Sequence, residues 1–331
     1  MKLELKKYSL QNLELNQAYL NKRPISIEKK LDAMKKKNMG EFQQVDYYVS
    51  NNDLPSFYMN AQSLIISENS QQIFTIKPIG FIISYSKQNI RKIHYKGEYG
   101  KWVNNFPVEK KQSIFLDLQV KIWDEKNHML GKNAMYIIED SFFHVKGNVK
   151  AYLFLEQNKD EIFINANEAL SYNTQTKQTI EFIKDVRGKI IRSNPLEEGI
   201  QFRSQYALND ALTSKIDLKE EVRIKKGELV AKGQYCEIFL ENYNKRIRYY
   251  ILKNDVKVLE KVISKKNNGT VFQRYAVCEK LEGIMSEKKM ILTGYPKVIQ
   301  GKDIIKGNII TLYENNEVVE VDDSNSLFEV K

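Results

Sequence analysis

The sequence predicts an all-β protein, built from stacked antiparallel repeats that form an elongated structure with an apolar interior. Three observations support this class. The 331-residue chain has only 6 Pro and 15 Gly but is rich in Asn, Lys, Ile and Tyr, which suits strands joined by Asn-based turns. Turn-forming clusters punctuate the chain from about residue 124 onward. An internal repeat of strand-like segments runs through most of its length.

Residues 1–44 differ from the remainder and predict a short helical N-terminal segment. Ser26 is placed to cap a helix that reaches about Met39, with an apolar stripe that includes Leu31, and Gly40 ends it. Lysines cover the opposite face. Two interpretations remain open: a cationic amphipathic helix on an anionic membrane, or a solvated helix packed on the first strands. The stripe is narrow and lacks Trp and Phe, which favours the second.

The repeat occurs seven times. Each copy has an apolar anchor, three intervening residues, a position that is Val in five copies, a basic residue in six, and then a small or apolar residue. Apolar residues at even offsets and a cation at an odd offset are typical of strands with one buried and one exposed face. The copies span residues 76–82, 116–122, 145–151, 182–188, 218–224, 252–258 and 292–298.

A second strand precedes most copies, so that one unit is about two strands and a turn. This strand opens on a small residue with an apolar residue three positions later, as in Ser204 and Ala207. Such a unit cannot cover its own apolar face, and neighbouring units must therefore stack and bury a continuous apolar strip.

The sequence carries no recognisable catalytic or metal-binding signature, and we expect neither an enzyme nor a cofactor. His94, His128 and His144 have no second ligand at metal-binding spacing, and the nucleophile and phosphate-loop motifs are absent. Cys236 and Cys278, 42 positions apart, form no zinc motif, and a disulfide between them is left open.

The formal net charge of +10 predicts attraction to anions, which include nucleic acid, phosphorylated lipid and acidic proteins. The cations are spread through every repeat instead of gathering in one patch, so we do not expect nucleic acid as a partner. No window approaches the roughly 20 apolar residues needed to span a bilayer, and the first residues lack a signal-peptide core. Taken literally, the sequence predicts a soluble chain that is not exported.

The segment from Lys289 to Val321 resembles the periplasmic bridge proteins of lipopolysaccharide transport, LptA and LptC, also called OstA-like. The similarity rests on Leu292-Thr-Gly, Pro296 and Val298, then Gly301-Lys-Asp, Ile305-Lys-Gly-Asn-Ile and Leu312-Tyr. Family members typically carry Asp where this chain has Asn308. Residues 46–81 look like the start of an LptC-type domain. The resemblance implies an LptC-like domain at 45–155 and an LptA/OstA-like domain at 156–331.

The resemblance implies a twisted β-jellyroll, or β-taco, whose interior carries the acyl chains of lipopolysaccharide or another anionic glycolipid across the periplasm. A 14-carbon chain exposed to water costs about 10 kcal/mol, which an apolar groove removes. Implied partners are the inner-membrane Lpt transporter complex and the outer-membrane Lpt translocon, and edge strands would allow a head-to-tail oligomer. LptC-type proteins usually begin with a membrane anchor, which this sequence lacks. The predicted lipid-binding residues that line the groove are Leu116, Val120, Ile122, Val145, Val149, Phe182, Val186, Leu218, Val222, Ile224, Leu252, Val256, Leu292 and Val298.

A rival hypothesis is a structural or adhesive β-repeat protein whose own side chains fill the interior. A groove wide enough for an acyl chain would favour the lipid conduit, and a sealed core would favour the rival. Pro296 replaces the usual Val and removes a hydrogen-bond donor, from which we predict that this end of the sheet is an edge and a docking point.

Overall fold

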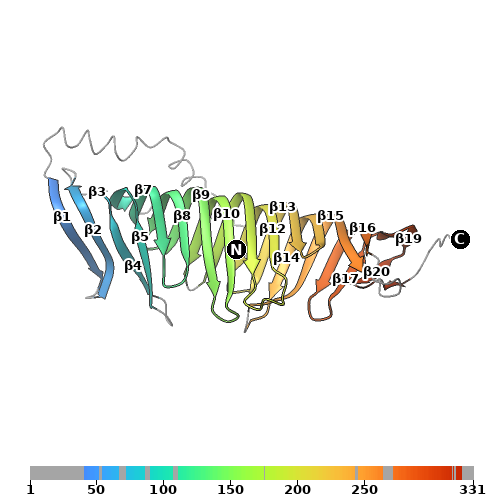
Figure 1. The fold of residues 1–331 in the computed structure, drawn as a ribbon. Coiled ribbons are helices and arrows are strands. Elements are labelled where there is room, and N and C mark those ends of the chain that lie inside the picture. Colours follow the sequence, from blue (N-terminus) through green and yellow to red (C-terminus); the bar gives the residue numbers. More distant parts are fainter. Residues whose placement is uncertain are drawn as a thin grey trace, which may run out of the picture.

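The structure, a computed structural model, describes residues 41–51, 54–66, 72–85, 90–106, 111–174, 176–242, 245–263, 271–314, 316 and 318–322. It is all-β, as predicted, and the strands stack into one elongated antiparallel sheet (Figure 1). The predicted N-terminal helix lies outside the described residues. The first ten strands are β1 Glu41–Asn51, β2 Leu54–Ile66, β3 Gln72–Ile76, β4 Ile79–Tyr85, β5 Ile90–Lys96, β6 Tyr99–Phe106, β7 Lys111–Trp123, β8 His128–Ile137, β9 Phe142–Leu155 and β10 Asp160–Asn173.

The remaining strands continue the same sheet. They are β11 Gln178–Ile191, β12 Ile200–Asp210, β13 Lys215–Lys226, β14 Leu229–Leu240, β15 Ile247–Ile263, β16 Val271–Ile284, β17 Lys289–Thr293, β18 Lys297–Gln300, β19 Asp303–Lys306, β20 Ile309–Tyr313 and β21 Val319–Asp322. From β7 to β16 each strand pairs antiparallel with the next one in the chain. Between β7 and β16 the sheet therefore grows in chain order.

The sheet is folded lengthwise because its strands bend in the middle. Within the repeat, the second and third residues after the anchor both have positive φ, as at Glu220 (62°) and Glu221 (53°) of β13. Two consecutive left-handed residues form the centre of a type I′ turn, and each such pair coincides with a shift of register in the ladder. The same pair of positions is left-handed in six of the seven copies: Leu118-Gln119, Gly147-Asn148, Lys184-Asp185, Glu220-Glu221, Asn254-Asp255 and Gly294-Tyr295.

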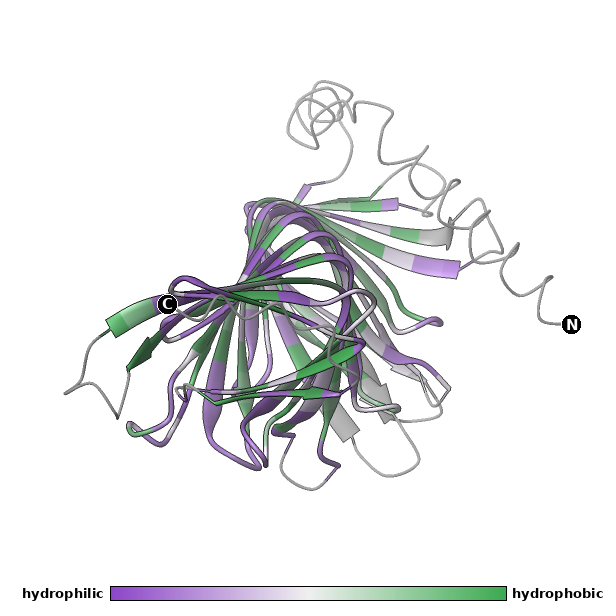
Figure 2. Ribbon diagram, turned by 90° about the vertical axis from the view of Figure 1, so that its right-hand side faces the viewer, coloured by the Kyte–Doolittle hydropathy of each residue, from purple (hydrophilic) through white to green (hydrophobic). Residues whose placement is uncertain are grey.

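Each bent strand therefore has two arms. We call the half that carries the repeat's anchor the anchor arm and the half that carries its Val the valine arm, for example Lys215–Lys219 and Val222–Lys226 of β13. At the ends of the sheet the two arms are separate short strands: β2 pairs with β3 on one arm and β4 on the other, and β16 likewise pairs with β17 and β18. Figure 2 looks along the long axis and shows the strands arching around an interior.

The repeat is therefore not one straight strand, as its alternating pattern had suggested, but two strand segments joined by a bend. Anchor and Val belong to different arms, and both face the interior because the turn between them reverses the direction of the sheet. Leu218 and Val222 of β13 are both at most 1% exposed. Small residues of the intervening strands face the Val positions, as Gly233 does opposite Val222, where an added Cβ would come within 2.9 Å of the Leu252 side chain.

This end of the sheet does have edge strands, as predicted, but Pro296 does not lie on one of them, so the reason given for the prediction is wrong. Pro296 follows the left-handed residues Gly294 and Tyr295 at the bend between β17 and β18, outside any ladder. β17 pairs with β16 and β20, and β18 pairs with β16 and β19, so both flanking strands have a neighbour on each side. Within the described residues, β19 and β21 are the strands at this end with one neighbour each.

The sheet runs without a break through the proposed domain boundary at residue 155. β9 ends there and pairs with β10 along twelve residues of each strand. The division at residue 155 stays a prediction based on resemblance, and one apolar core extends across it.

Candidate functional site

An apolar cavity of about 280 Å³ lies between the two arms in the middle of the chain. That volume is nearly twice the ~150 Å³ of an engineered apolar cavity that binds benzene. The surrounding wall comes from β9 to β15, with additions from residues 285 and 314. The lining residues are Leu153, Leu155, Gln157, Ile162, Ile164, Phe182, Ile190, Arg192, Ile200, Phe202, Ala207, Asn209, Asp210, Ala211, Ser214, Ile216, Leu218, Ile224, Lys226, Leu229, Ile238, Leu240, Lys245, Ile247, Tyr250, Met285 and Glu314.

The bend explains why one strand supplies opposite walls of this cavity. β11 contributes Phe182 from its anchor arm and Ile190 from its valine arm, and β13 contributes Leu218 and Ile224 in the same way. Because most inward positions are apolar, the interior between the arms is lined largely by hydrocarbon. Polar lining residues are confined to the strand ends and turns.

Three of the fourteen predicted groove residues, Phe182, Leu218 and Ile224, line this cavity. Leu116 and Ile122 border a separate space of about 10 Å³, too small for more than one water. The other nine belong to the same core cluster and are at most 1% exposed, but they do not border the large cavity. These nine are Val120, Val145, Val149, Val186, Val222, Leu252, Val256, Leu292 and Val298.

Several wall residues were not identified from the sequence. Ile162, Phe202, Ile216 and Ile247 are only partly buried although they face the interior, since they border empty space instead of other side chains. They lie outside the seven-residue repeat, towards the strand ends. Bulky apolar residues at inward positions beyond the repeat, alternating with polar ones, are the signal that could have indicated them.

Charged and polar residues gather where the two arms end. On the valine-arm side Lys226 forms a 2.7 Å ion pair with Glu314, which lies on the anchor-arm side. On the anchor-arm side the Lys245 ammonium donates to Ser214 Oγ at 2.7 Å. The cavity therefore has an apolar interior and a rim with charged groups of both signs, an arrangement that suits a ligand with an apolar tail and a polar head.

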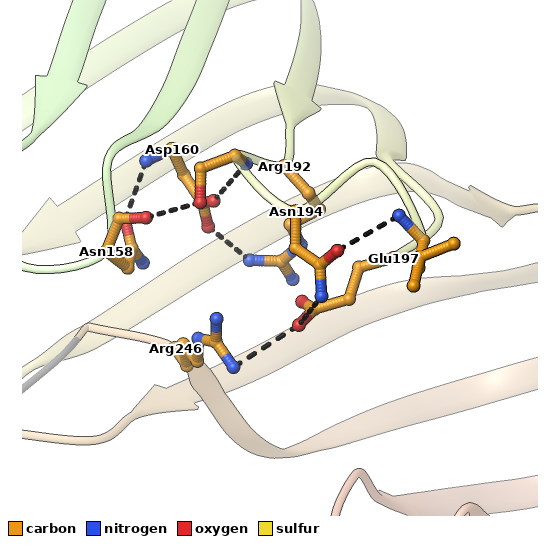
Figure 3. Close-up of polar contacts among 8 residues, drawn as sticks. Asn158, Asp160, Arg192, Asn194, Glu197 and Arg246 are labelled. Carbon is orange, nitrogen blue, oxygen red and sulfur yellow. Dashed lines mark hydrogen bonds and ion pairs between the residues drawn. The ribbon is translucent and has the colours of Figure 1, made fainter.

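The loop after β11, residues 192–199, is held at this rim by a buried ion pair. Arg192 Nη1 lies 2.6 Å from Asp160 Oδ2, with the two side chains 10% and 2% exposed (Figure 3). The other Asp160 oxygen accepts a hydrogen bond from the Ser193 backbone N–H at 2.9 Å, and Ser193 Oγ donates to the Asn158 carbonyl. A buried carboxylate with this many partners fixes the start of the loop.

The tip of the same loop reaches the opposite rim. Glu197 Oε1 accepts a hydrogen bond from Asn194 and lies 3.4 Å from Arg246 Nη1, which belongs to the turn before β15 (Figure 3). Both side chains of this ion pair are well exposed, so solvent screens it and it holds the arms together weakly. The Glu197–Arg246 contact is thus a weak tie across the mouth.

A stronger tie closes the interior towards the C-terminal end. Arg274 of β16 is 1% exposed and is paired with the buried Glu260 carboxylate of β15. Its other N–H groups donate to the carbonyl oxygens of Tyr313, at 2.9 Å, and Asn316, at 2.7 Å. One guanidinium therefore joins the valine arm to the chain segment that follows β20.

Large aromatic side chains fill the interior towards the N-terminal end. Tyr136 and Phe143 stack with ring centroids 4.1 Å apart, and Phe57 stacks on Tyr95 at 5.8 Å. Burial raises the pKa of Tyr136 to about 12. These aromatic rings and the Arg274 contacts thus occupy the interior on either side of the stretch that holds the cavity.

The two cysteines are free and buried. Cys236 of β14 and Cys278 of β16 are separated by β15, since Cys236 pairs with Leu252 and Cys278 with Val256. Two strand spacings amount to about 9.6 Å, beyond the Cα separation of about 7 Å that a disulfide tolerates. Burial raises the pKa of the Cys278 thiol to about 12.

Among the described residues, no group of three or more His, Cys, Asp or Glu side chains is arranged to hold a metal ion. His144 is buried, with Nε2 3.2 Å from Glu168 Oε2, whereas His94 and His128 lie on the outer face beside other aromatic rings. The described part of the chain contains no helix long and apolar enough to cross a bilayer.

No protein family model and no curated protein matches this chain. Among solved structures it is similar to LptH of Pseudomonas aeruginosa, described as the LptA-homologous periplasmic component of the lipopolysaccharide transport device. The match has 14% sequence identity, covers 38% of this chain and 82% of that one, and has a TM-score of 0.33. A likeness at this level does not bear on what the chain binds.

Proposed function

We propose that this protein is a lipid-binding carrier that takes up the acyl part of an amphiphile between the arms of its folded sheet. The single observation that carries the proposal is the cavity of about 280 Å³ with apolar walls and a charged rim. By the ratio to the benzene-binding cavity, it has room for roughly a dozen carbon atoms. At about 0.8 kcal/mol per buried methylene, that many carbons would gain on the order of 10 kcal/mol by leaving water.

The sequence resemblance supports a narrower version of the proposal. Leu292-Thr-Gly and the segments after it resemble LptA and LptC, and on that basis the ligand is lipopolysaccharide or a related anionic glycolipid that crosses the periplasm. The Lpt transporter complex of the inner membrane and the translocon of the outer membrane are the partners proposed with it. Lys245 at the rim, whose ammonium donates to the neutral Ser214 hydroxyl, suits an anionic head group, whereas Lys226 is already paired with Glu314.

The arms must separate for a ligand with several acyl chains to enter, because the cavity holds only part of one. The tie nearest its mouth is the exposed Glu197–Arg246 pair, and exposed pairs contribute about 0–1 kcal/mol. Separating the arms at this point therefore requires little free energy, whereas the buried Arg274 contacts oppose separation towards the C-terminal end. We propose that lipid enters beside the 192–199 loop.

Site-specific photo-crosslinking in cells tests the proposal with neighbouring residues as matched controls. A photoreactive side chain at Ile224 or Phe202 faces the cavity, and one at Lys225 or Gln201 faces solvent. Lipid adducts at the first two positions and none at the second two are expected. The absence of lipid adducts at both cavity positions in folded protein, or equal labelling of cavity-facing and solvent-facing positions, would refute lipid carriage and favour the structural β-repeat alternative.

A further inference from the structure

One row of outward-facing residues on the valine arm is almost entirely cationic. The ladder registers place these residues directly opposite one another on successive strands, at the basic position of the repeat and its partners on the intervening strands. From β5 to β19 ten of the thirteen positions are Lys or Arg and none is acidic. In order they are Lys96, Lys121, Leu130, Lys150, Asn165, Arg187, Arg203, Arg223, Lys232, Lys257, Val277, Lys297 and Lys306.

The row is densest on β11 to β15, where five consecutive strands each present a cation. These five are Arg187, Arg203, Arg223, Lys232 and Lys257, and all are exposed. Strands lie about 4.8 Å apart, so the run is about 19 Å long. Like charges directly opposite each other destabilise a sheet, and an anion bound along the row would remove that repulsion.

Internal neutralisation of this run is incomplete. Asp185 lies 2.8 Å from Arg187 and 3.4 Å from Arg203. Arg223, Lys232 and Lys257 form no ion pair with any residue in the part of the chain that the structure describes, although acidic side chains such as Glu221 sit at the neighbouring bend. These cations form a solvent-exposed line that is one residue wide, and the acidic residues of the bend lie along one side of it.

We propose that this cationic row binds an extended acidic polysaccharide, one with a negative charge on each sugar. A hexose residue in an extended polysaccharide spans about one strand spacing, so successive charges meet successive strands. A flat anionic membrane fits the row poorly for two reasons. Neighbouring strands of a sheet are twisted relative to one another, so successive positions of the row do not lie in one plane, and a planar surface would also meet the acidic bend.

Single-stranded nucleic acid fits less well because it needs rings on which its bases stack. The neighbouring outward row beside the dense run consists of Lys189, Gln201, Lys225, Val230 and Leu259, none of which is aromatic. Elsewhere in that second row aromatic residues lie from β1 to β10, where they contact mainly one another, as Tyr152 stacks on His128 at 5.1 Å, and at Tyr275 of β16, opposite Leu259. An acidic sugar chain requires only the regularly spaced charges.

The test compares binding of four labelled probes by fluorescence anisotropy: an oligogalacturonate, a neutral dextran, an oligothymidylate and vesicles containing phosphatidylglycerol. We expect oligogalacturonate to bind at least tenfold more tightly than the other three, with an affinity that falls steeply with salt. Tighter binding of the oligothymidylate or the vesicles, or no binding of oligogalacturonate, would overturn the proposal.

A pair of charge-matched variants locates the site. The triple variant Arg203→Gln, Arg223→Gln and Lys232→Gln should bind oligogalacturonate at least tenfold more weakly. The control Lys159→Gln, Lys288→Gln and Lys302→Gln removes the same charge from exposed turns and should stay within twofold of wild type. Equal losses in the two variants would mean that only net charge matters. The single change Lys257→Glu, matched by Lys288→Glu, gives the same comparison if a triple variant does not fold.

Discussion

Replacing Arg274 by Met should cost about 3–5 kcal/mol of stability. Arg274 is 1% exposed, and its guanidinium pairs with Glu260 and donates to the carbonyls of Tyr313 and Asn316. Met keeps much of the volume but leaves the Glu260 carboxylate buried without its cation. Breaking a buried pair on one side costs this much because the remaining charge stays desolvated.

The double variant Glu260→Leu with Arg274→Met should recover most of that loss, since hydrophobic replacements of both members of a buried ion pair are often neutral or stabilising. The carbonyl oxygens of Tyr313 and Asn316 would still lack the hydrogen bonds that Arg274 donates, which costs about 1–3 kcal/mol of stability for each oxygen if no water replaces the donor. We therefore expect the double variant to lie between wild type and the single variant.

Urea unfolding of the three proteins measures these differences, and hydrogen exchange of residues 271–314 shows where they act. Each repeat in such an elongated fold depends mainly on its neighbours, so protection should fall first in β16, β17 and β20, not in β7 to β9. A loss below 1 kcal/mol for Arg274→Met, or a double variant less stable than the single one, would show that the reasoning about the buried pair is incorrect.

Three further predictions concern the cavity and the charges around it. The new side chain of Ala207→Phe projects into the cavity and should weaken binding of a fluorescent fatty acid at least tenfold without lowering the unfolding midpoint. The control is the same change at Ala169, which is buried but does not line the cavity, and it should instead destabilise the protein by about 1–3 kcal/mol. Glu197→Gln removes the weak tie to Arg246 and should speed fatty-acid uptake in stopped-flow mixing with less than 1 kcal/mol change in stability; unchanged uptake would count against entry beside this loop. Hydrogen bonds from two lysines lower the pKa of Glu237 from 4.5 to about 2, so its carboxylate stabilises the fold above pH 4.5, and this contribution disappears as the pH falls towards 2. Glu237→Gln should therefore lower the melting temperature at pH 7, and the difference in melting temperature from wild type should be smaller near pH 2. An equal difference at both pH values would contradict the assignment.

The sequence determined the class of fold and the repeating unit. Apolar anchors and Val positions recur because each strand must bury one face, and their burial depends only on local pattern. Leu218 and Val222 illustrate this, since both are predicted interior residues and both are buried. Gly or Asn is the usual signal for the turn that lies between anchor and Val, and it is present in copies such as Gly147-Asn148. In β13 the left-handed pair is Glu220-Glu221, which carries no such signal, so the bend common to the copies was not predicted.

Tertiary structure decided which interior residues border open space. Phe182 and Val186 look alike in the repeat, yet the first lines the cavity and the second packs at the bend, because the arms diverge with distance from the turn. It also decided where the charges lie. Basic residues that are 15 to 25 positions apart in sequence, such as Arg187, Arg203 and Arg223, form one line on the surface, since hydrogen-bond register and not sequence separation sets which side chains are neighbours.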